Sequence, residues 1–262
     1  GVRAFLRDRG ARWVLGGWAI FTVENVVLSE NKDWIKRNWG GKGGPKAYQR
    51  VYSLCSTAAI GYTCLAYWRF ARTGLVLAGS RRSLPVRAAA LALRSAGLVA
   101  LGQLMPPVDW VALLDYVGLS ASARGTELGG PLCPWDLNAH KDRGEVYGIT
   151  RVTRRPELIG LGAIGLGGAL LAGSATQACF LGVGPAVCFA ALALHGDRAQ
   201  RLSGDLSPTK EAQTSVLPFL ALLDGRQSWA ALGEELDPKN AKAALGLALL
   251  FALRPPWMRW VP

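Results

Sequence analysis

The stretch "GITRVTRRPELIGLGAIGLGGALL", residues 148–171, decides the fold because a cationic entry leads directly into a long apolar run. Arg151, Arg154 and Arg155 stand immediately before Pro156, and the residues that follow are almost all small or apolar. Proline suits the first position of a helix, where its missing N–H is not needed. The stretch therefore predicts a helix that begins at Pro156 and runs through an apolar environment.

This predicted helix is dense in glycine, which destabilises a helix in water by about 1 kcal/mol per residue. We expect that the glycines allow close packing against neighbouring helices. The alternative is the close approach of a flat ligand, such as a carotenoid, a chlorophyll or a heme. The glycines concerned are Gly160, Gly162, Gly165, Gly167 and Gly168.

The composition of the whole chain is apolar. Of its 262 residues, 50% are hydrophobic and only 18% are charged, whereas a soluble domain carries about 25% charged residues. Several apolar runs approach the ~20 residues that a helix needs to cross a bilayer. The chain is therefore predicted to be an all-α, polytopic integral membrane helix bundle of about five or six transmembrane helices. A soluble protein with buried helices is the alternative, because some of the runs are short.

The apolar runs and the polar segments between them form a single membrane domain. The predicted spans lie at about 11–29, 51–71, 88–116, 156–173, 177–195 and 241–257. The predicted polar loops are 30–50, 119–155 and 196–240. Within the last loop, "TSVLPFLALLDGRQSW" is expected to lie on the surface as an amphipathic segment. Its apolar face would hold Val216, Leu217, Leu220 and Leu223.

The charge balance is strongly basic, with a formal net charge of +12. The basic residues gather at the ends of the apolar runs, and most of the ten tryptophans fall there too. This placement suits lipid head groups or membrane subunits with acidic surfaces, and we expect no nucleic-acid partner.

Residues that could carry chemistry are few. There are two histidines, His140 and His195, and no motif of a phosphate-binding loop or a zinc site, so no metal site is predicted. The five cysteines include no C-x-x-C pair and are interpreted as small apolar residues. Glu24 is a carboxylate well inside a predicted span, which makes it a functional candidate by default. A structural role is the alternative, in which Glu24 is hydrogen-bonded in the bundle or paired with an arginine of residues 151–155.

Three stretches together resemble the membrane family that unites the bacterial NnrU proteins with plastid cis-zeta-carotene isomerase. They are "GITRVTRRPELIGLGAIG", "HGDRAQRL" and "TSVLPFLALLDGRQ". The resemblance covers the chain from about Phe21 to Trp229. In the last two stretches the matching residues include Asp197, Arg198, Thr214, Ser215, Val216, Pro218, Phe219, Ala221, Gly225, Arg226 and Gln227.

The resemblance implies a membrane helix bundle that holds heme b through histidine and isomerises a polyene double bond. This chain departs from that pattern at the histidines: Glu24, followed by Asn25, stands at one motif histidine and Arg155 at another. His195 takes the place of a motif asparagine; it would cap the end of its helix or, as an alternative, ligate a chlorophyll magnesium. The positions that correspond to the family site are Glu24, Asn25, Arg151, Arg154, Arg155 and Pro156.

The retained motifs and the missing histidines favour a non-catalytic, zeta-carotene-isomerase-like scaffold. The resemblance implies an accessory subunit of a larger membrane complex, a photosystem or light-harvesting assembly of the chloroplast thylakoid. One alternative is a heme-dependent cis-zeta-carotene isomerase of carotenoid biosynthesis, with iron held by Glu24, His195 or a cysteine thiolate. Another is a carrier of carotenoid or chlorophyll. A mitochondrial or bacterial membrane remains an alternative location, because part of the family is bacterial.

Overall fold

The protein is described here by a computed structural model, which covers residues 5, 7–39, 44–71, 74–77, 83–105 and 146–253, with the backbone alone for 39, 44–47 and 251–253. Within these residues the chain is all-α and has no strand, so the all-α part of the predicted fold class is confirmed. Three predicted features lie outside the described residues: the extension of the third span to residue 116, the loop 119–145 with His140, and the end of the last span at 254–257.

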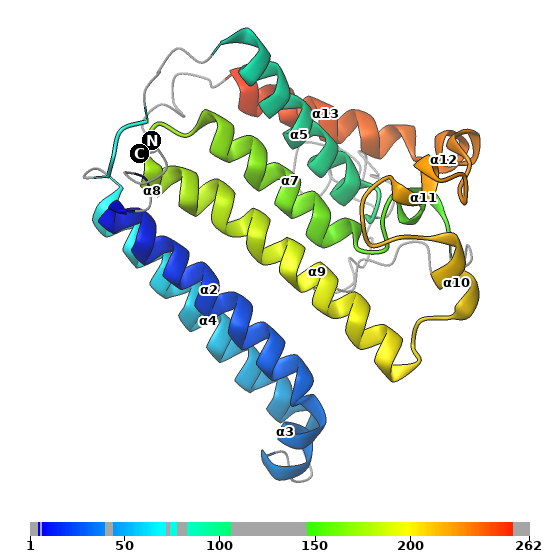
Figure 1. Ribbon diagram of the computed structural model, residues 1–262, viewed down its shortest axis with the longest axis horizontal. Coiled ribbons are helices and arrows are strands. Elements are labelled where there is room, and N and C mark those ends of the chain that lie inside the picture. Colours follow the sequence, from blue (N-terminus) through cyan, green and yellow to red (C-terminus); the bar gives the residue numbers. More distant parts are fainter. Residues whose placement is uncertain are drawn as a thin grey trace, which may run out of the picture.

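Two long helices form a hairpin at the N-terminal side of the molecule. α2 (Arg9–Glu30) leads through the short α3 (Lys32–Trp39) into α4 (Gly44–Phe70), which runs back along α2 (Figure 1). The two helices approach closely where Gly17 of α2 meets the buried Thr63 of α4.

Four more helices extend the bundle sideways from this hairpin. α5 (Leu84–Gly102), α7 (Pro156–Leu171) and α9 (Gly184–Ser203) lie side by side in that order. α9 packs against α2, and α13 (Pro238–Leu253) packs against α5 at the opposite edge (Figure 1). As predicted, α7 begins at Pro156.

Each predicted span overlaps a helix, although several boundaries differ. α4 begins seven residues before the predicted start at 51, and α5 ends at Gly102, short of the predicted end at 116. α9 continues without a break from α8 (Ala175–Ala178) and the π-helical turn η5 (Cys179–Val183), and it runs eight residues past the predicted end at 195. Among the described helices, Leu84–Gly102 and Ala175–Ser203 are long and apolar enough to cross a membrane, and Pro156–Leu171 is a shorter apolar helix.

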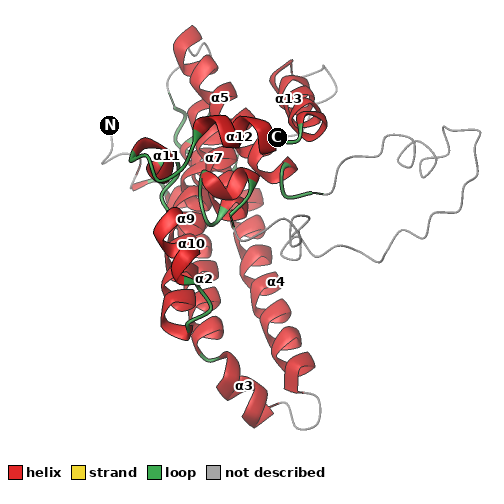
Figure 2. Cartoon of the chain, turned by 90° about the vertical axis from the view of Figure 1, so that its right-hand side faces the viewer, coloured by secondary structure: helices red, strands yellow, loops and turns green. Residues whose placement is uncertain are grey.

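One end of the bundle is covered by short elements that we call the cap. It comprises η4 (Gly148–Arg151), α10 (Pro208–Gln213), α11 (Leu220–Leu223), α12 (Trp229–Glu235) and the segments between them. Figure 2, which faces the right-hand side of Figure 1, shows α11 and α12 in front of α7. The apolar centre of the cap packs on the end of α5 through Leu104, Ile149, Val152, Leu222 and Leu232.

The cap corrects the prediction of a surface-lying amphipathic segment. In the stretch that starts at Thr214, only Leu220–Leu223 is helical before Trp229. Phe219 and Gly225 have φ angles of 63° and 80°, which a continuous right-handed helix does not allow. The expected apolar face is nevertheless exposed at Leu217, Leu220 and Leu223.

At the opposite end, Asp8 ties three segments together. Its Oδ1 accepts a hydrogen bond of 2.7 Å from the Ala11 N–H and thereby caps α2. Its Oδ2 accepts the Leu75 N–H at 2.7 Å, and the buried Thr176 hydroxyl donates to Oδ1 at 3.3 Å. This Asp8 clamp joins the start of α2, the α4–α5 connection and the start of α8.

The glycines of α7 allow close contacts with both neighbouring helices. A Cβ added at Gly167 would lie 2.7 Å from the Ala90 carbonyl oxygen of α5, and one at Gly168 would lie 2.9 Å from the Leu181 carbonyl oxygen of η5. From the α5 side, a Cβ at Gly97 would collide with the Gly160 carbonyl oxygen. The packing explanation for the glycine density is therefore confirmed at these contacts.

We predict that Gly97→Ala lowers the stability of the bundle by about 1–3 kcal/mol, the usual cost of overpacking. The new methyl group meets backbone, which cannot turn aside as a side chain can. Gly16→Ala on α2 is the matched control, because nothing lies within 4 Å of its added Cβ and alanine favours a helix. Thermal unfolding in mild detergent measures both, and equal melting temperatures for the two variants would contradict the packing argument.

Candidate functional site

The three stretches that carry the resemblance meet where the cap joins the bundle, around a buried ion pair. Arg154, just before α7, places its guanidinium as a fork on Asp197 of α9: Nε donates to Oδ1 at 2.7 Å and Nη2 to Oδ2 at 3.2 Å. Only 3% of the Arg154 side chain and 9% of the Asp197 side chain are exposed. A two-bond fork of this kind fixes orientation as well as distance.

Arg154 also holds the third stretch. Its Nη1 donates to the Thr214 carbonyl oxygen at 3.0 Å, and its backbone N–H donates to the Ser215 carbonyl oxygen at 2.9 Å. The neighbouring Thr153 hydroxyl donates to the Val216 carbonyl oxygen at 2.7 Å. The guanidinium of Arg154 is therefore bonded to groups within the protein and does not face an open site.

Asp197 is neutralised from a second side. Arg201, one helical turn further along α9, donates from Nε to Oδ2 of Asp197 at 3.0 Å. Arg201 also forms an ion pair with Glu211 of α10. Arg154, Asp197, Arg201 and Glu211 together form a charge network that we call the motif clamp.

Arg151 makes a second fork within the cap. Its Nε donates to Oε2 of Glu235 at 2.7 Å, its Nη2 pairs with Oε1, and its Nη1 donates to Gln227. The Gly148 N–H adds a 2.6 Å bond to the same carboxylate. Hydrogen bonding to Arg151 lowers the pKa of Glu235 below its ordinary value, and the same bond raises the pKa of Arg151. Glu235 was not a predicted site residue, because nothing near it in the sequence marks a partner 84 positions away.

The remaining residues of the third motif shape the surface of the cap. Arg226 pairs with Asp224 at 2.6 Å and donates to the Thr214 carbonyl oxygen at 3.0 Å. Gly225 occupies the left-handed conformation that this tight turn requires. Pro218, Phe219 and, on α9, Arg198 are exposed.

Glu24 and Asn25 take part in a separate polar cluster between α2 and α4. One oxygen of Glu24 accepts bonds of 2.8 Å from the Ser56 hydroxyl and from the Asn25 side chain, and the Tyr52 hydroxyl donates to Asn25. The other oxygen, Oε2, is buried and has no hydrogen-bond partner. Hydrogen bonding within the bundle, one form of the structural alternative for Glu24, is therefore observed.

The other form, an ion pair between Glu24 and the arginines of residues 151–155, is not observed among the described residues. Arg151 and Arg154 are held by Glu235 and Asp197. Arg155 lies 3.9 Å from Glu157, and its guanidinium packs over Gly196 of α9. Its Nε is buried without a hydrogen-bond partner.

His195 connects α9 with the end of α2. Its Nε2 lies 2.8 Å from the Ser29 hydroxyl oxygen, and its Nδ1 lies 3.9 Å from a Glu30 carboxylate oxygen. The prediction that it caps its own helix is wrong, because α9 continues to Ser203. Both ring nitrogens face groups of α2, which leaves neither of them directed at an open ligand site.

The donors at the family positions do not fit a heme held by histidine. Arg155 is a cation that repels iron, and Glu24 offers only its buried Oε2, because Oε1 is bonded to Ser56 and Asn25. Cys179 and Cys188 are buried in the packing of η5 and α9. Among the described residues, no three histidine, cysteine or acidic side chains gather as they would around a metal ion.

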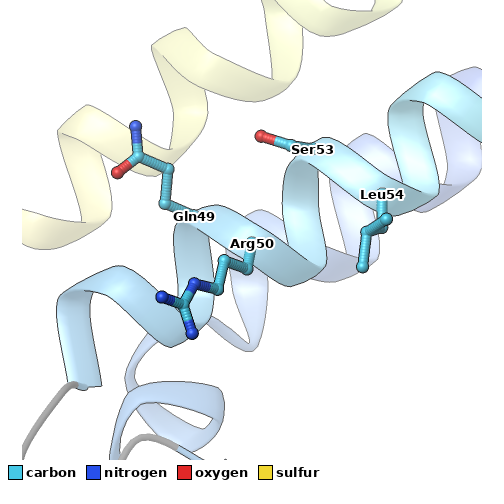
Figure 3. Close-up of a pocket in the computed structure, with 4 residues that line it drawn as sticks. All are labelled: Gln49, Arg50, Ser53 and Leu54. Atoms are coloured by element: carbon cyan, nitrogen blue, oxygen red, sulfur yellow. The ribbon is translucent and has the colours of Figure 1, made fainter.

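Two hollows lie elsewhere on the described surface. One, of about 570 Å³, borders α4 at Gln49, Arg50, Ser53 and Leu54; Gln49 and Ser53 point to a different side of the helix from Arg50 and Leu54 (Figure 3). The second, also about 570 Å³, lies between α5 and α13. Its lining is almost entirely apolar and consists of Leu98, Leu101, Gly102, Met105, Asn240, Ala243, Ala244, Gly246, Leu247 and Leu250.

Comparison with known proteins finds no matching family model, no similar curated protein and no similar solved structure. The resemblance noted in the sequence therefore stays a prediction.

We predict that Asp197→Asn costs about 3–5 kcal/mol of stability, because it leaves the buried Arg154 guanidinium without its counter-charge. Asp224→Asn is the matched control, since its pair with Arg226 is solvent-exposed and should change stability little. Equilibrium unfolding in detergent with a chemical denaturant compares the two. Equal, small losses would show that the motif clamp does not hold the cap.

The lowered pKa of Glu235 predicts a loss of stability in acid. A carboxylate whose pKa is lower in the folded state than in the unfolded chain stabilises the fold above its unfolded pKa, and this contribution disappears as the pH falls through the folded pKa. For Glu235 the loss begins as the pH falls towards the ordinary value of 4.5 and is complete only below the lower pKa of the folded state. Melting temperatures of wild type and Glu235→Gln should differ at pH 7 and converge in acid, whereas a constant difference would contradict the role assigned to this carboxylate.

Proposed function

We propose that this chain is a polytopic membrane helix bundle that acts as a non-catalytic accessory subunit of a larger membrane complex. The observation that carries the proposal is the motif clamp. Arg154, Asp197 and Thr214 come from the three stretches that resemble the isomerase family, and they bind one another in a buried network. Residues that bind one another in a buried network stabilise a scaffold and are not exposed to a substrate.

The spacing of polar groups along the helices supports the membrane part of the proposal. Thr176 in the Asp8 clamp and Asp197 in the motif clamp lie on one continuous helix, 21 residues apart. At about 1.5 Å per residue they are roughly 30 Å apart, which is about the thickness of the bilayer hydrocarbon core. Asp8, which caps α2, and Ser29 near the end of α2, which contacts His195, are separated by the same number of residues.

The exposure of the apolar helices also supports a membrane location. Only 11% of the apolar window of α5 and 39% of that of Ala175–Ser203 is buried inside the protein. The core helix of a soluble protein would be mostly buried. Large apolar side chains such as Trp68, Val187 and Leu54 are 80%, 64% and 71% exposed. Lipid or other membrane subunits would cover this surface.

The cellular location of the complex is inferred from the resemblance alone. It leads us to propose a photosystem or light-harvesting assembly of the chloroplast thylakoid. The net charge of +12 favours neighbours with acidic surfaces or anionic lipid head groups. A carrier of carotenoid or chlorophyll is the second candidate function, and the apolar cavity between α5 and α13 is the observation that favours it.

The proposal is tested by purifying the tagged chain from its native membrane in mild detergent. We expect it to migrate with other membrane subunits on a native gel and to give no heme signal in a pyridine hemochrome assay. Glu24→Gln and His195→Gln should leave the absorption spectrum unchanged, because neither side chain would ligate iron. A chain that migrates alone with stoichiometric heme, lost in either variant, would overturn the proposal and favour the isomerase.

A further inference from the structure

The surface of the cap carries a ridge of exposed apolar side chains. Within 13 residues, five large apolar side chains are each at least 40% exposed, and we call them the ridge: Leu217, Phe219, Leu220, Leu223 and Trp229. Phe219 and Trp229 stack with ring centroids 6.2 Å apart. The five exposed side chains are therefore clustered on one short segment, and two of them are in direct contact.

The backbone holds the ridge in this position. Phe219 has a φ of 63°, in the left-handed region that costs a residue with a side chain about 1–2 kcal/mol. Its N–H donates to the Val152 carbonyl oxygen at 2.9 Å, and the next residues, Ala221 and Leu222, are buried in the cap. The segment is thus fastened on its inner side while its largest side chains face outward.

The ridge lies at the level of the motif clamp. Val216, just before it, accepts the hydroxyl of Thr153, which precedes Arg154. Leu222, a buried residue between the ridge residues Leu220 and Leu223, belongs to the same apolar cluster as Leu104, just past the end of α5. If the two clamps mark the edges of the hydrocarbon core, the ridge lies at one of these edges, beside the ends of the apolar helices.

The composition of the ridge suits the boundary between lipid head groups and acyl chains. Leucine and aromatic side chains enter this boundary readily, and tryptophan is enriched there. The charged groups between the ridge residues are Asp224 and Arg226, which pair with each other and add no net charge. Insertion would therefore be driven by apolar burial and would not require anionic lipid.

We propose that the ridge is an in-plane membrane anchor, inserted into the interfacial layer of the leaflet beside the motif clamp. This inference rests on the proposed membrane bundle. The anchor would hold the cap against the bilayer and fix the depth of α5, α7 and α9 through the bonds that Arg154 and Thr153 make to the same segment.

The test uses an environment-sensitive fluorophore on single introduced cysteines in the full chain, reconstituted in phosphatidylcholine nanodiscs. Cys55, Cys64 and Cys133 are first replaced by alanine to prevent labelling elsewhere. Leu223→Cys reports on the ridge, and Thr209→Cys, on the exposed surface of α10, is the matched control. Ala92→Cys, exposed near the middle of α5, reports on the bundle itself.

We expect blue-shifted emission at Leu223→Cys, with severalfold stronger quenching by lipids that carry a nitroxide near the head group than by lipids that carry it near the chain end. The Thr209→Cys label should emit as in water, and the Ala92→Cys label should be quenched best by the deep nitroxide. If the Leu223→Cys label emits as in water while the Ala92→Cys label is quenched by the deep nitroxide, the anchor is overturned and the membrane bundle is not. The same result is expected if a protein subunit, and not lipid, covers the ridge in the native membrane. If neither label is quenched, the membrane bundle itself is overturned.

Discussion

The fork between Arg154 and Asp197 is the contact on which the order of this end of the molecule depends. It brings together a turn before α7, the outer part of α9 and an irregular segment of the cap. Removing Asp197 would leave the buried guanidinium of Arg154 without a counter-charge, whereas removing Arg154 would leave Asp197 paired with Arg201 alone. Arg201 adds a second cation at Oδ2 of Asp197, and Nη1 of Arg154 donates to the carbonyl oxygens of Thr214 and Glu211.

Between this network and Asp8, the helices are held by contacts of a different kind. The α5–α7 and α7–η5 contacts are made by glycines that bring backbone against backbone, as at Gly97 and Gly167. In lipid, apolar burial gives little preference for helix association, so close packing must supply much of it. Polar clamps at the two ends and glycine contacts between them are a consistent arrangement for a bundle surrounded by hydrocarbon.

The sequence predicts the long helices well because their signals are local. Apolar runs and Pro156 are enough to place α7, and an apolar run places α2 to within two residues at each end. The same reasoning finds α4 and α5 but misses the first seven residues of α4 and the end of α5 at Gly102. The cap could not be predicted, because its positions are set by partners far along the chain, such as Glu235 for Arg151. The end of α9 was misplaced for a related reason: His195, Asp197 and Arg201 look like a polar loop until their partners on α2 and in the cap are known.

The polar cluster around Glu24 gives a structural role to a position that the resemblance aligns with a motif histidine. Glu24, Asn25, Tyr52 and Ser56 join α2 to α4 by side-chain hydrogen bonds, which are worth more where water is absent. At the other family position, Arg155 packs over Gly196, where a larger residue would crowd the guanidinium. Both positions therefore connect neighbouring elements in this chain. Arg155 is a cation and cannot ligate iron, so iron at these two positions could be held only through the buried Oε2 of Glu24, which has no hydrogen-bond partner. A single carboxylate oxygen is not the histidine ligation that the resemblance implies.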